Sequence, residues 1–195
     1  GPAAGVVGGI SIASDAGEEN SISVDMGGTS FDVSLCHKGE IKRSQESEIS
    51  RLPIKVPMID IHTLGAGGGS IAWIDPGGAL RVGPSSAGAD PGPACYGKGG
   101  EQPTVTDANL VLGRLSSSSM LAGEVGLDIN KSIHVIETKL AKPLGLTVEQ
   151  VAVGIIKVIN ASMIKGIRVV SVAKGYDPRD FALIAFGGAG PLHAA

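Results

Sequence analysis

The sequence predicts an α/β fold in which helices flank a mixed sheet. Three observations support this class. Residues 22–24 and 31–35 alternate apolar and polar side chains, as half-buried strands do. Residues 181–186 form a continuous apolar run of the length of a buried strand. Residues 147–175 carry apolar side chains three and four positions apart, which is typical of a long amphipathic helix.

The remaining elements are shorter. Glycine and proline are dense between residues 65 and 100, and such a length of irregular chain in a compact domain is usually functional or mobile. The Asp-Pro-Gly-Gly sequence at residues 75–78 predicts a turn within it. The other expected elements are a helix over residues 3–13, strands over 41–47 and 70–74, and a helix over 106–115.

The long helix has clear signals at both ends. Thr147 and Gln150 have the spacing of a capping box, and Gly175 followed by Asp-Pro predicts its end. Asn160 and Lys165 lie on this helix, where a ligand contact is conceivable and a solvated polar face is the favoured interpretation.

Composition narrows the function classes. The chain has 195 residues, a net charge of −3 and no basic run, which argues against nucleic acid as the principal partner. Two cysteines predict a reducing compartment without a disulfide framework. No apolar run reaches the length of a membrane span and no signal peptide opens the sequence, so we expect no membrane partner and a cytoplasmic location. The 30 glycines have no collagen period and are interpreted as turns and points of close backbone approach.

The first glycine cluster lies between the first two predicted strands. The sequence Asp25-Met-Gly27-Gly28-Thr29-Ser30 places an acidic residue before two glycines and two hydroxyls. Glycines at a hairpin tip remove side chains that would obstruct a phosphate and leave N–H groups free to donate to it. Asp25 could hold a hydrated magnesium ion that bridges to the phosphate. The alternative is an ordinary hairpin closed by a two-glycine turn.

The second glycine cluster follows the apolar run at residues 181–186. It contains Gly187, Gly188 and Gly190, and Pro191 marks the start of a helix. A strand, a glycine turn and a helix N-terminus together form a site for an anion or for the flat face of a nucleotide. The dinucleotide fingerprint needs a further glycine and an acidic residue that this sequence does not supply, so a Rossmann fold is disfavoured.

Taken together, these two clusters resemble the hydantoinase A and 5-oxoprolinase family, whose relatives include subunits of acetone and acetophenone carboxylases. Residues 1–6, 60–72 and 83–97 resemble the same family, so the likeness runs along the whole chain. The first cluster is also similar to the second phosphate-binding hairpin of the actin, sugar-kinase and heat-shock chaperone ATPase superfamily. The second cluster resembles the adenosine-binding turn of that superfamily.

The resemblance implies an actin-like ATPase lobe, with residues 1–195 forming a single hydantoinase A-like lobe of a larger two-lobed protein. It implies ATP-dependent hydrolysis of a cyclic amide such as a hydantoin or 5-oxoproline, with ATP and Mg²⁺ as cofactors. The implied partners are a missing N-terminal lobe, a hydantoinase B-like subunit or domain, and a small cyclic amide. A ketone carboxylase subunit and a non-catalytic nucleotide-binding lobe are the alternatives.

The resemblance also assigns roles. Gly27, Gly28, Thr29 and Ser30 would hold phosphate together with Gly187, Gly188 and Gly190 of the second cluster. Asp25 would hold magnesium, and Asp32 would orient the nucleophile or a metal-bound water. Both aspartates are therefore candidate catalytic residues.

Three weaker candidates remain. Asp60 and His62, two residues apart on a predicted strand, would share a face and could ligate a further transition metal, or His62 could simply bond within the following glycine loop. Nothing in the sequence brings His193 near them as a third ligand. Cys95 could be a nucleophile, although a packed thiol is favoured.

Overall fold

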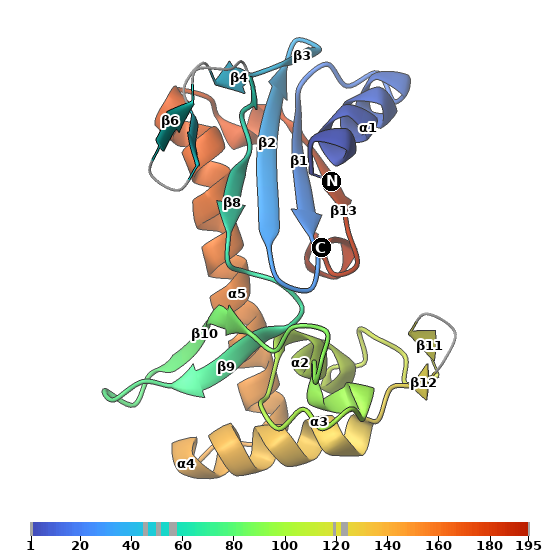
Figure 1. Ribbon diagram of the computed structural model, residues 1–195, viewed down its shortest axis with the longest axis vertical. Helices are drawn as coiled ribbons and strands as arrows, with labels where there is room; N and C mark the ends of the chain where they lie inside the picture. Colours follow the sequence, from blue (N-terminus) through green and yellow to red (C-terminus); the bar gives the residue numbers. More distant parts are fainter. Residues whose placement is uncertain are drawn as a thin grey trace.

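A mixed sheet forms the upper part of the molecule in Figure 1. The computed structural model describes residues 2–44, 47–49, 52–54, 58–118, 120–121 and 125–194. The strand order is β13-β1-β2-β3, and β8 pairs with β2 beside β3. The strands are β1 (Ser21–Met26), β2 (Phe31–His37), β3 (Glu40–Ile41), β8 (His62–Leu64) and β13 (Ala182–Phe186). Because β1 runs parallel to β13 and antiparallel to β2, the mixed sheet expected from the sequence is confirmed.

The two faces of the sheet differ in chemistry. The pairs Ile22 with Leu35, Val24 with Val33 and Met26 with Phe31 face the long helix α5 (Val148–Val170) and are buried in the main core. The opposite face carries Ser21, Ser23, Ser34 and the aspartates at positions 25 and 32, on the side of helix α1 (Pro2–Asp15). The alternation seen in the sequence therefore separates an apolar packing face from a polar face.

Helix α5 joins the sheet to a second, lower part of the molecule (Figure 1). There it packs on the hairpin of β9 (Ser70–Ile74) and β10 (Leu80–Ser86) and on helix α2 (Val105–Val111). Below them a continuous helical stretch comprises α3 (Ile129–Ile136), a π-helical turn (Glu137–Ala141) and α4 (Lys142–Leu144). Residues of both parts belong to one hydrophobic core, so the two parts pack as a unit.

The other elements are small. They are the strands β4 (Arg43–Ser44), β5 (Ser47–Ile49), β6 (Leu52–Ile54), β7 (Met58–Ile59), β11 (Met120–Leu121) and β12 (Val125–Gly126), and the 3-10 turns Ala94–Tyr96, Val172–Lys174, Pro178–Asp180 and Gly190–His193. Among the described residues, no single helix has the length and apolar composition of a membrane span. Only the bent pair Ile129–Leu144 and Val148–Lys174 would meet that test jointly.

Most expected elements are present. The capping box of α5 is complete, because Gln150 N donates to Thr147 Oγ1 at 3.1 Å and Thr147 N donates to Gln150 Oε1 at 2.9 Å. The first helix, the strand at residues 70–74, its Asp-Pro-Gly-Gly turn and a helix near 106–115 also form. The strand expected at 41–47 is replaced by the two-residue strands β3 and β4, while residues 45 and 46 lie outside the described part of the chain.

Two expectations were wrong or incomplete. The hairpin between β1 and β2 is not closed by a two-glycine turn, because Met26 pairs with Phe31 and residues 27–30 form a longer connection. The sequence analysis also missed β10 and the helical stretch from residue 129 to 144. Asp128 caps that stretch by accepting from Asn130 N and Lys131 N, which is a recognisable start signal.

Candidate functional site

The hairpin tip, residues 27–30, presents bare backbone to the outside. Gly27 N donates to Ser30 O at 3.1 Å and closes the connection. A Cβ built at Gly27 or Gly28 would meet no atom of the described residues within 4 Å, and neither glycine has a positive φ. The fold of this chain therefore does not require glycine at either position. Approach of an external ligand to the backbone is a physical reason for the missing side chains.

A buried loop of three glycines, the triglycine loop at residues 67–69, supports the tip from beneath. Gly68 N donates to Gly27 O at 2.9 Å, and Gly69 N donates to Gly28 O at 2.6 Å. A Cβ at Gly67 would lie 2.5 Å from the carbonyl carbon and oxygen of Gly28. These contacts fix the peptide planes of the tip, because both glycine carbonyls are tied to the loop.

Thr106 anchors the triglycine loop to helix α2. Its backbone N and its Oγ1 both donate to Gly68 O at 2.8 Å. The dense glycine and proline region was expected to be functional or mobile. The triglycine part of it is buried and hydrogen-bonded, so it acts as a support for the tip.

Two carboxylates lie side by side at the base of the tip. Asp25 and Asp32 are direct partners across β1 and β2. Asp32 accepts from Thr63 Oγ1 at 2.5 Å and from Ser30 Oγ at 3.3 Å. Burial, together with the like charge of Asp32, raises the pKa of Asp25. A divalent cation beside these oxygens would relieve that repulsion, so the donor set fits magnesium.

The second glycine cluster lies against the end of β1. Gly187 has φ +84°, and a Cβ there would collide with the Asp25 carboxylate and with Met26 O. Ala189 N donates to Met26 O at 2.8 Å. Gly190 is buried, and a Cβ at Gly188 would meet nothing within 4 Å. Backbone strain and packing therefore explain Gly187, whereas Gly188 is open as the tip glycines are.

A single cavity of about 180 Å³ brings the two clusters and the triglycine loop together. It is lined by Gly27, Gly28, Gly68, Tyr96, Thr106, Asn109, Leu115, Leu127, Gly188, Ala189 and Leu192. Both glycine clusters were expected to hold phosphate together, and residues of both line this cavity. Thr29 is exposed beside it, with its Oγ1 3.5 Å from Ser86 Oγ.

His193 is buried between two asparagines next to this cavity. Its Nδ1 lies 2.7 Å from Asn160 Oδ1, and its Nε2 lies 3.3 Å from Asn109 Nδ2. Burial and the nearby Arg114 charge lower the pKa of His193 to about 4. Asn160 is thus partly buried and bonded within the protein, whereas Lys165 is exposed as expected.

The weaker candidates gain little from the structure. Lys174 Nζ forms an ion pair with the Asp60 carboxylate. Of the two candidate ligands Asp60 and His62, His62 belongs to a strand and Asp60 does not. The described residues contain no group of three or more His, Cys, Asp or Glu side chains placed to hold a metal. A transition-metal role for Asp60 and His62 therefore stays a prediction without a third ligand in the described part of the chain.

Cys95 has the environment of a packed thiol. It is fully buried, and burial with the neighbouring Asp107 carboxylate raises its pKa far above the usual range. Asp107 accepts from Cys95 N, from Thr104 Oγ1 and from Ser132 Oγ at 3.0, 2.7 and 2.7 Å. This network ties the segment around Cys95 to α2 and α3, and a thiol kept protonated is a poor nucleophile.

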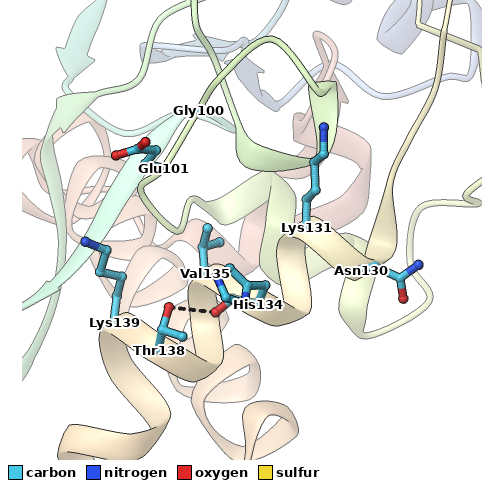
Figure 2. Close-up of a pocket in the computed structure, with 8 residues that line it drawn as sticks. All are labelled: Gly100, Glu101, Asn130, Lys131, His134, Val135, Thr138 and Lys139. Atoms are coloured by element: carbon cyan, nitrogen blue, oxygen red, sulfur yellow. Dashed lines mark hydrogen bonds between the residues drawn. The ribbon is translucent and has the colours of Figure 1, made fainter.

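A larger hollow of about 680 Å³ lies between α3 and the segment at Gly100 and Glu101 (Figure 2). Lys131 and Lys139 extend from the helix toward that segment, and His134 lies between them (Figure 2). Both lysines and His134 are exposed. The hollow contains neither of the glycine clusters, and we do not assign it to the site.

Sequence reasoning missed the supporting residues of the site. The triglycine loop was noticed only within the glycine-dense region 65–100 and a family likeness, although three successive glycines between predicted strands signal close backbone approach. Thr106 and Asn109 were read only as members of a helix. No local pattern distinguishes them, because their roles depend on residues more than 30 positions away.

The chain is similar to known proteins along its whole length. The model of the hydantoinase/oxoprolinase family matches residues 1–195. The chain is 55% identical over 193 residues to the caprolactamase alpha subunit of Pseudomonas jessenii, covering 99% of this chain and 28% of that protein. It is 42% identical over 210 residues to 5-oxoprolinase of Saccharomyces cerevisiae, covering 100% of this chain and 16% of the relative.

Solved structures confirm the fold. The nucleotide-free structure of an acetone carboxylase superposes with a TM-score of 0.89 at 36% identity, over 99% of this chain and 27% of that one. The ATP-dependent caprolactamase of Pseudomonas jessenii superposes with a TM-score of 0.88 at 56% identity, over 95% of this chain and 27% of its own. The chain thus spans less than a third of these relatives and has the α/β fold expected of an actin-like ATPase lobe. The family model and the similar sequences agree, and the chain belongs to the hydantoinase/oxoprolinase family.

Proposed function

We propose that this chain is the nucleotide-binding lobe of a longer two-lobed enzyme that opens a cyclic amide with consumption of ATP. The observation that carries the proposal is the bare hairpin tip, whose glycines the fold does not need and whose carbonyls are held by the triglycine loop. The family, and the ATP-dependent caprolactamase among its relatives, support ATP as the nucleotide.

Each residue at the tip has a role in this proposal. The backbone N–H groups of the tip glycines and the Thr29 hydroxyl would donate to phosphate oxygens. Ser30 Oγ donates to Asp32 in this structure, so Ser30 would reach phosphate only by turning its hydroxyl. Asp25 and Asp32 would hold a hydrated magnesium ion, which neutralises phosphate charge. Gly188 would let the nucleotide approach the second cluster.

The chemistry explains why a ring-opening hydrolase needs a phosphoryl-transfer site. The amide oxygen of the substrate attacks the terminal phosphorus of ATP, and ADP leaves. The carbonyl carbon then becomes electrophilic enough for water to add. The ring C–N bond breaks, the nitrogen takes a proton, and a second water releases phosphate from the acyl phosphate. The products are an open-chain amino acid, ADP and phosphate.

A ketone carboxylase subunit is the second candidate. The structural match to an acetone carboxylase supports this candidate at the level of the fold. Such an enzyme would use the same tip to activate a ketone or bicarbonate by phosphoryl transfer. A non-catalytic nucleotide-binding lobe is the third candidate. We further propose a hydantoinase B-like partner, since relatives include a protein named as a subunit. The cytoplasmic location expected from the sequence stays a proposal.

The experiment that separates these candidates is an ATP consumption assay of the full-length protein with its partner subunit. A panel of lactams, hydantoins, 5-oxoproline and ketones is added one at a time, with bicarbonate present or absent. ADP release coupled to a cyclic amide supports the hydrolase, and bicarbonate-dependent release with a ketone supports the carboxylase. If no compound of the panel causes ATP consumption, the hydrolase and the carboxylase are both contradicted. The non-catalytic nucleotide-binding lobe then remains.

The lobe alone should bind nucleotide weakly. It supplies one phosphate hairpin and one glycine turn, whereas phosphoryl transfer needs donors on both sides of a closed cleft. Loss of half of these donors would remove several kcal/mol, and affinity falls about tenfold for each ~1.4 kcal/mol. Calorimetric titration of the 195-residue chain with a magnesium nucleotide should give a dissociation constant weaker than micromolar. Tighter binding would contradict the two-lobed proposal.

A further inference from the structure

Three side chains form a polar row across neighbouring strands of the sheet. Asp25 of β1 is the direct partner of Asp32 of β2, and Asp32 is the direct partner of Thr63 of β8. Direct partners across a ladder project from the same face, so all three side chains lie on the polar face of the sheet. Thr63 is exposed, whereas both aspartates are partly buried. The row thus places a hydroxyl of β8 next to the candidate magnesium ligands.

The Asp32 carboxylate is held by two hydroxyls, one on each oxygen. Thr63 Oγ1 donates to Oδ1 at 2.5 Å, and Ser30 Oγ donates to Oδ2 at 3.3 Å. Charge-assisted bonds from a hydroxyl to a carboxylate are about 2.5–2.7 Å long, so the bond from Thr63 is of this strong kind and the bond from Ser30 is not. Thr63 therefore contributes most to fixing the rotation of the carboxylate about its Cβ–Cγ bond.

The two hydroxyls leave Asp32 able to bind a cation. A carboxylate has about four lone-pair directions, and each hydroxyl uses one of the two on its oxygen. Asp32 lies between Thr63 and Asp25 in the row, so an ion shared by the two aspartates would be separated from Thr63 by Asp32. Thr63 would then act on the ion through Asp32 and not as a ligand.

Ser30 cannot serve the carboxylate and a phosphate with the same proton. A serine hydroxyl has one O–H donor, and Ser30 is a candidate phosphate-binding residue of the tip. When this hydroxyl turns toward phosphate, Asp32 loses the bond from Ser30. Thr63 belongs to β8 and not to the tip, so its bond to Asp32 does not depend on that turn. Among the described residues, Thr63 is then the side-chain donor left on Asp32.

We propose that Thr63 is a positioning residue of the magnesium site and holds the Asp32 carboxylate in the orientation that binds the ion. This inference rests on the proposed function, in which Asp25 and Asp32 hold magnesium beside a nucleotide at the tip. Removal of a group that hydrogen-bonds a ligating side chain typically lowers metal affinity about 10- to 100-fold. The alternative is a cross-strand pair that contributes only to the stability of the sheet.

The test measures Mn²⁺ binding to the full-length protein with its partner subunit. The protein carries a non-hydrolysable ATP analogue, and electron paramagnetic resonance reports the free ion, corrected for Mn²⁺ bound by the free analogue. Thr63→Val keeps the branched shape and removes the hydroxyl, and Thr63→Ser restores the hydroxyl. Thr138→Val is the matched control, because Thr138 Oγ1 donates to His134 O at the remote hollow of Figure 2. The Mg²⁺ concentration that half-saturates ATP consumption and the unfolding midpoint are measured for each variant.

Thr63→Val should raise the Mn²⁺ dissociation constant about tenfold or more, and the half-saturating Mg²⁺ concentration by a similar factor. Thr63→Ser and Thr138→Val should bind Mn²⁺ as the parent protein does. If Thr63→Val fails to fold, Thr63→Ala, which also lacks the hydroxyl, takes its place. Failure of both variants to fold would mean that the hydroxyl serves the fold, and it would overturn the proposal.

Two results with folded variants also overturn the proposal. One is an unchanged Mn²⁺ dissociation constant in Thr63→Val, and a lower unfolding midpoint in that variant would then assign Thr63 to sheet stability alone. The other is a Thr63→Ser variant that binds Mn²⁺ as weakly as Thr63→Val, because the hydroxyl would then not be the cause. Both results leave the ring-opening function standing if the parent protein consumes ATP with a cyclic amide.

The parent protein separates this inference from the proposed function. A parent that binds no Mn²⁺ in the presence of the analogue overturns the magnesium assignment and this inference together. A parent that binds Mn²⁺ through Thr63 and Asp32, but consumes ATP with no cyclic amide, supports this inference and contradicts the ring-opening function alone.

Discussion

The glycines of the hairpin tip and the glycines beneath it are surrounded very differently. At Gly27 and Gly28 a side chain would meet open space, and the backbone angles are those of any residue. At Gly67 a side chain would press on backbone atoms of the tip at 2.5 Å, and at Gly187 it would collide with Asp25 and Met26. The lower set is explained by the fold. The fold does not explain the tip glycines, whereas the proposed approach of phosphate from outside would explain them.

This contrast teaches that glycine content by itself does not identify a phosphate site. A glycine that the packing demands carries no information about a ligand, because the fold would retain it in any case. A glycine that the packing does not demand leaves the backbone open to an external ligand. The following predictions are ranked by their effect on the stability of the fold, from the supporting glycines to the tip.

Gly67→Ala should have the largest effect. The added methyl group meets three backbone atoms of Gly28 and Thr29, and backbone cannot turn aside as a side chain can. We expect a loss of about 3 kcal/mol in the free energy of unfolding, at the upper end of the range for overpacking. Denaturant midpoints of the full-length protein measure this loss. Gly27→Ala is the matched control and should be neutral or slightly stabilising, because alanine restricts the unfolded chain.

If Gly67→Ala and Gly27→Ala lower the midpoint equally, the distinction between the two sets of glycines fails. An equal loss would mean that the tip is packed in solution and that its glycines serve the fold. Preservation of the midpoint in both variants would show that the triglycine loop does not press on the tip.

Acid should destabilise the protein through His193. Its folded pKa of about 4 lies below the ~6.5 of an unfolded histidine, so the unfolded state binds more protons between these values. Stability is therefore complete above pH ~6.5 and falls as the pH drops toward ~4, by roughly 2 kcal/mol. Unfolding midpoints across this window test the expectation. His193→Gln should remove this part of the slope, and an unchanged slope in that variant would assign the effect to another group.

Thr147→Ala should lower the free energy of unfolding at a position remote from both sets of glycines, and it serves as a reference for them. Thr147 Oγ1 accepts from Gln150 N in the capping box of α5, and its removal should cost about 1 kcal/mol. ATP consumption per folded molecule should not change, because the cap lies at the lower end of α5 and contacts neither cluster. A fall in specific activity would mean that helix stability and the site are coupled.

Local rules predicted much of the fold. The alternation at Ile22–Leu35, the apolar run before Gly187 and the capping box at Thr147 each depend on neighbouring residues, and each is found in the structure. The longer connection at the tip could not be predicted, because the partners that bind Gly27 O and Gly28 O come from residues 68 and 69. The helices between residues 129 and 144 were not predicted, although Asp128 gives a recognisable start signal.

Some residues of the candidate site were also predictable from local sequence, and others were not. The tip and the second cluster were visible as motifs because glycine, hydroxyl and acidic residues follow one another in the sequence. The pairing of Asp25 with Asp32 follows from strand register and was within reach of the sequence. Asn109 was not, because its place at the cavity depends on a bond to His193, 84 positions away.

Gly28→Val tests the central claim most directly, because it should affect stability least and function most. A Cβ at Gly28 would meet no atom of the described residues within 4 Å, so the free energy of unfolding should change by no more than the ~0.5 kcal/mol typical of surface substitutions. The same side chain would occupy the space proposed for phosphate, so ATP consumption by the full-length protein should be abolished. A stable variant with unchanged ATP turnover would contradict the assignment of the hairpin tip as the phosphate site.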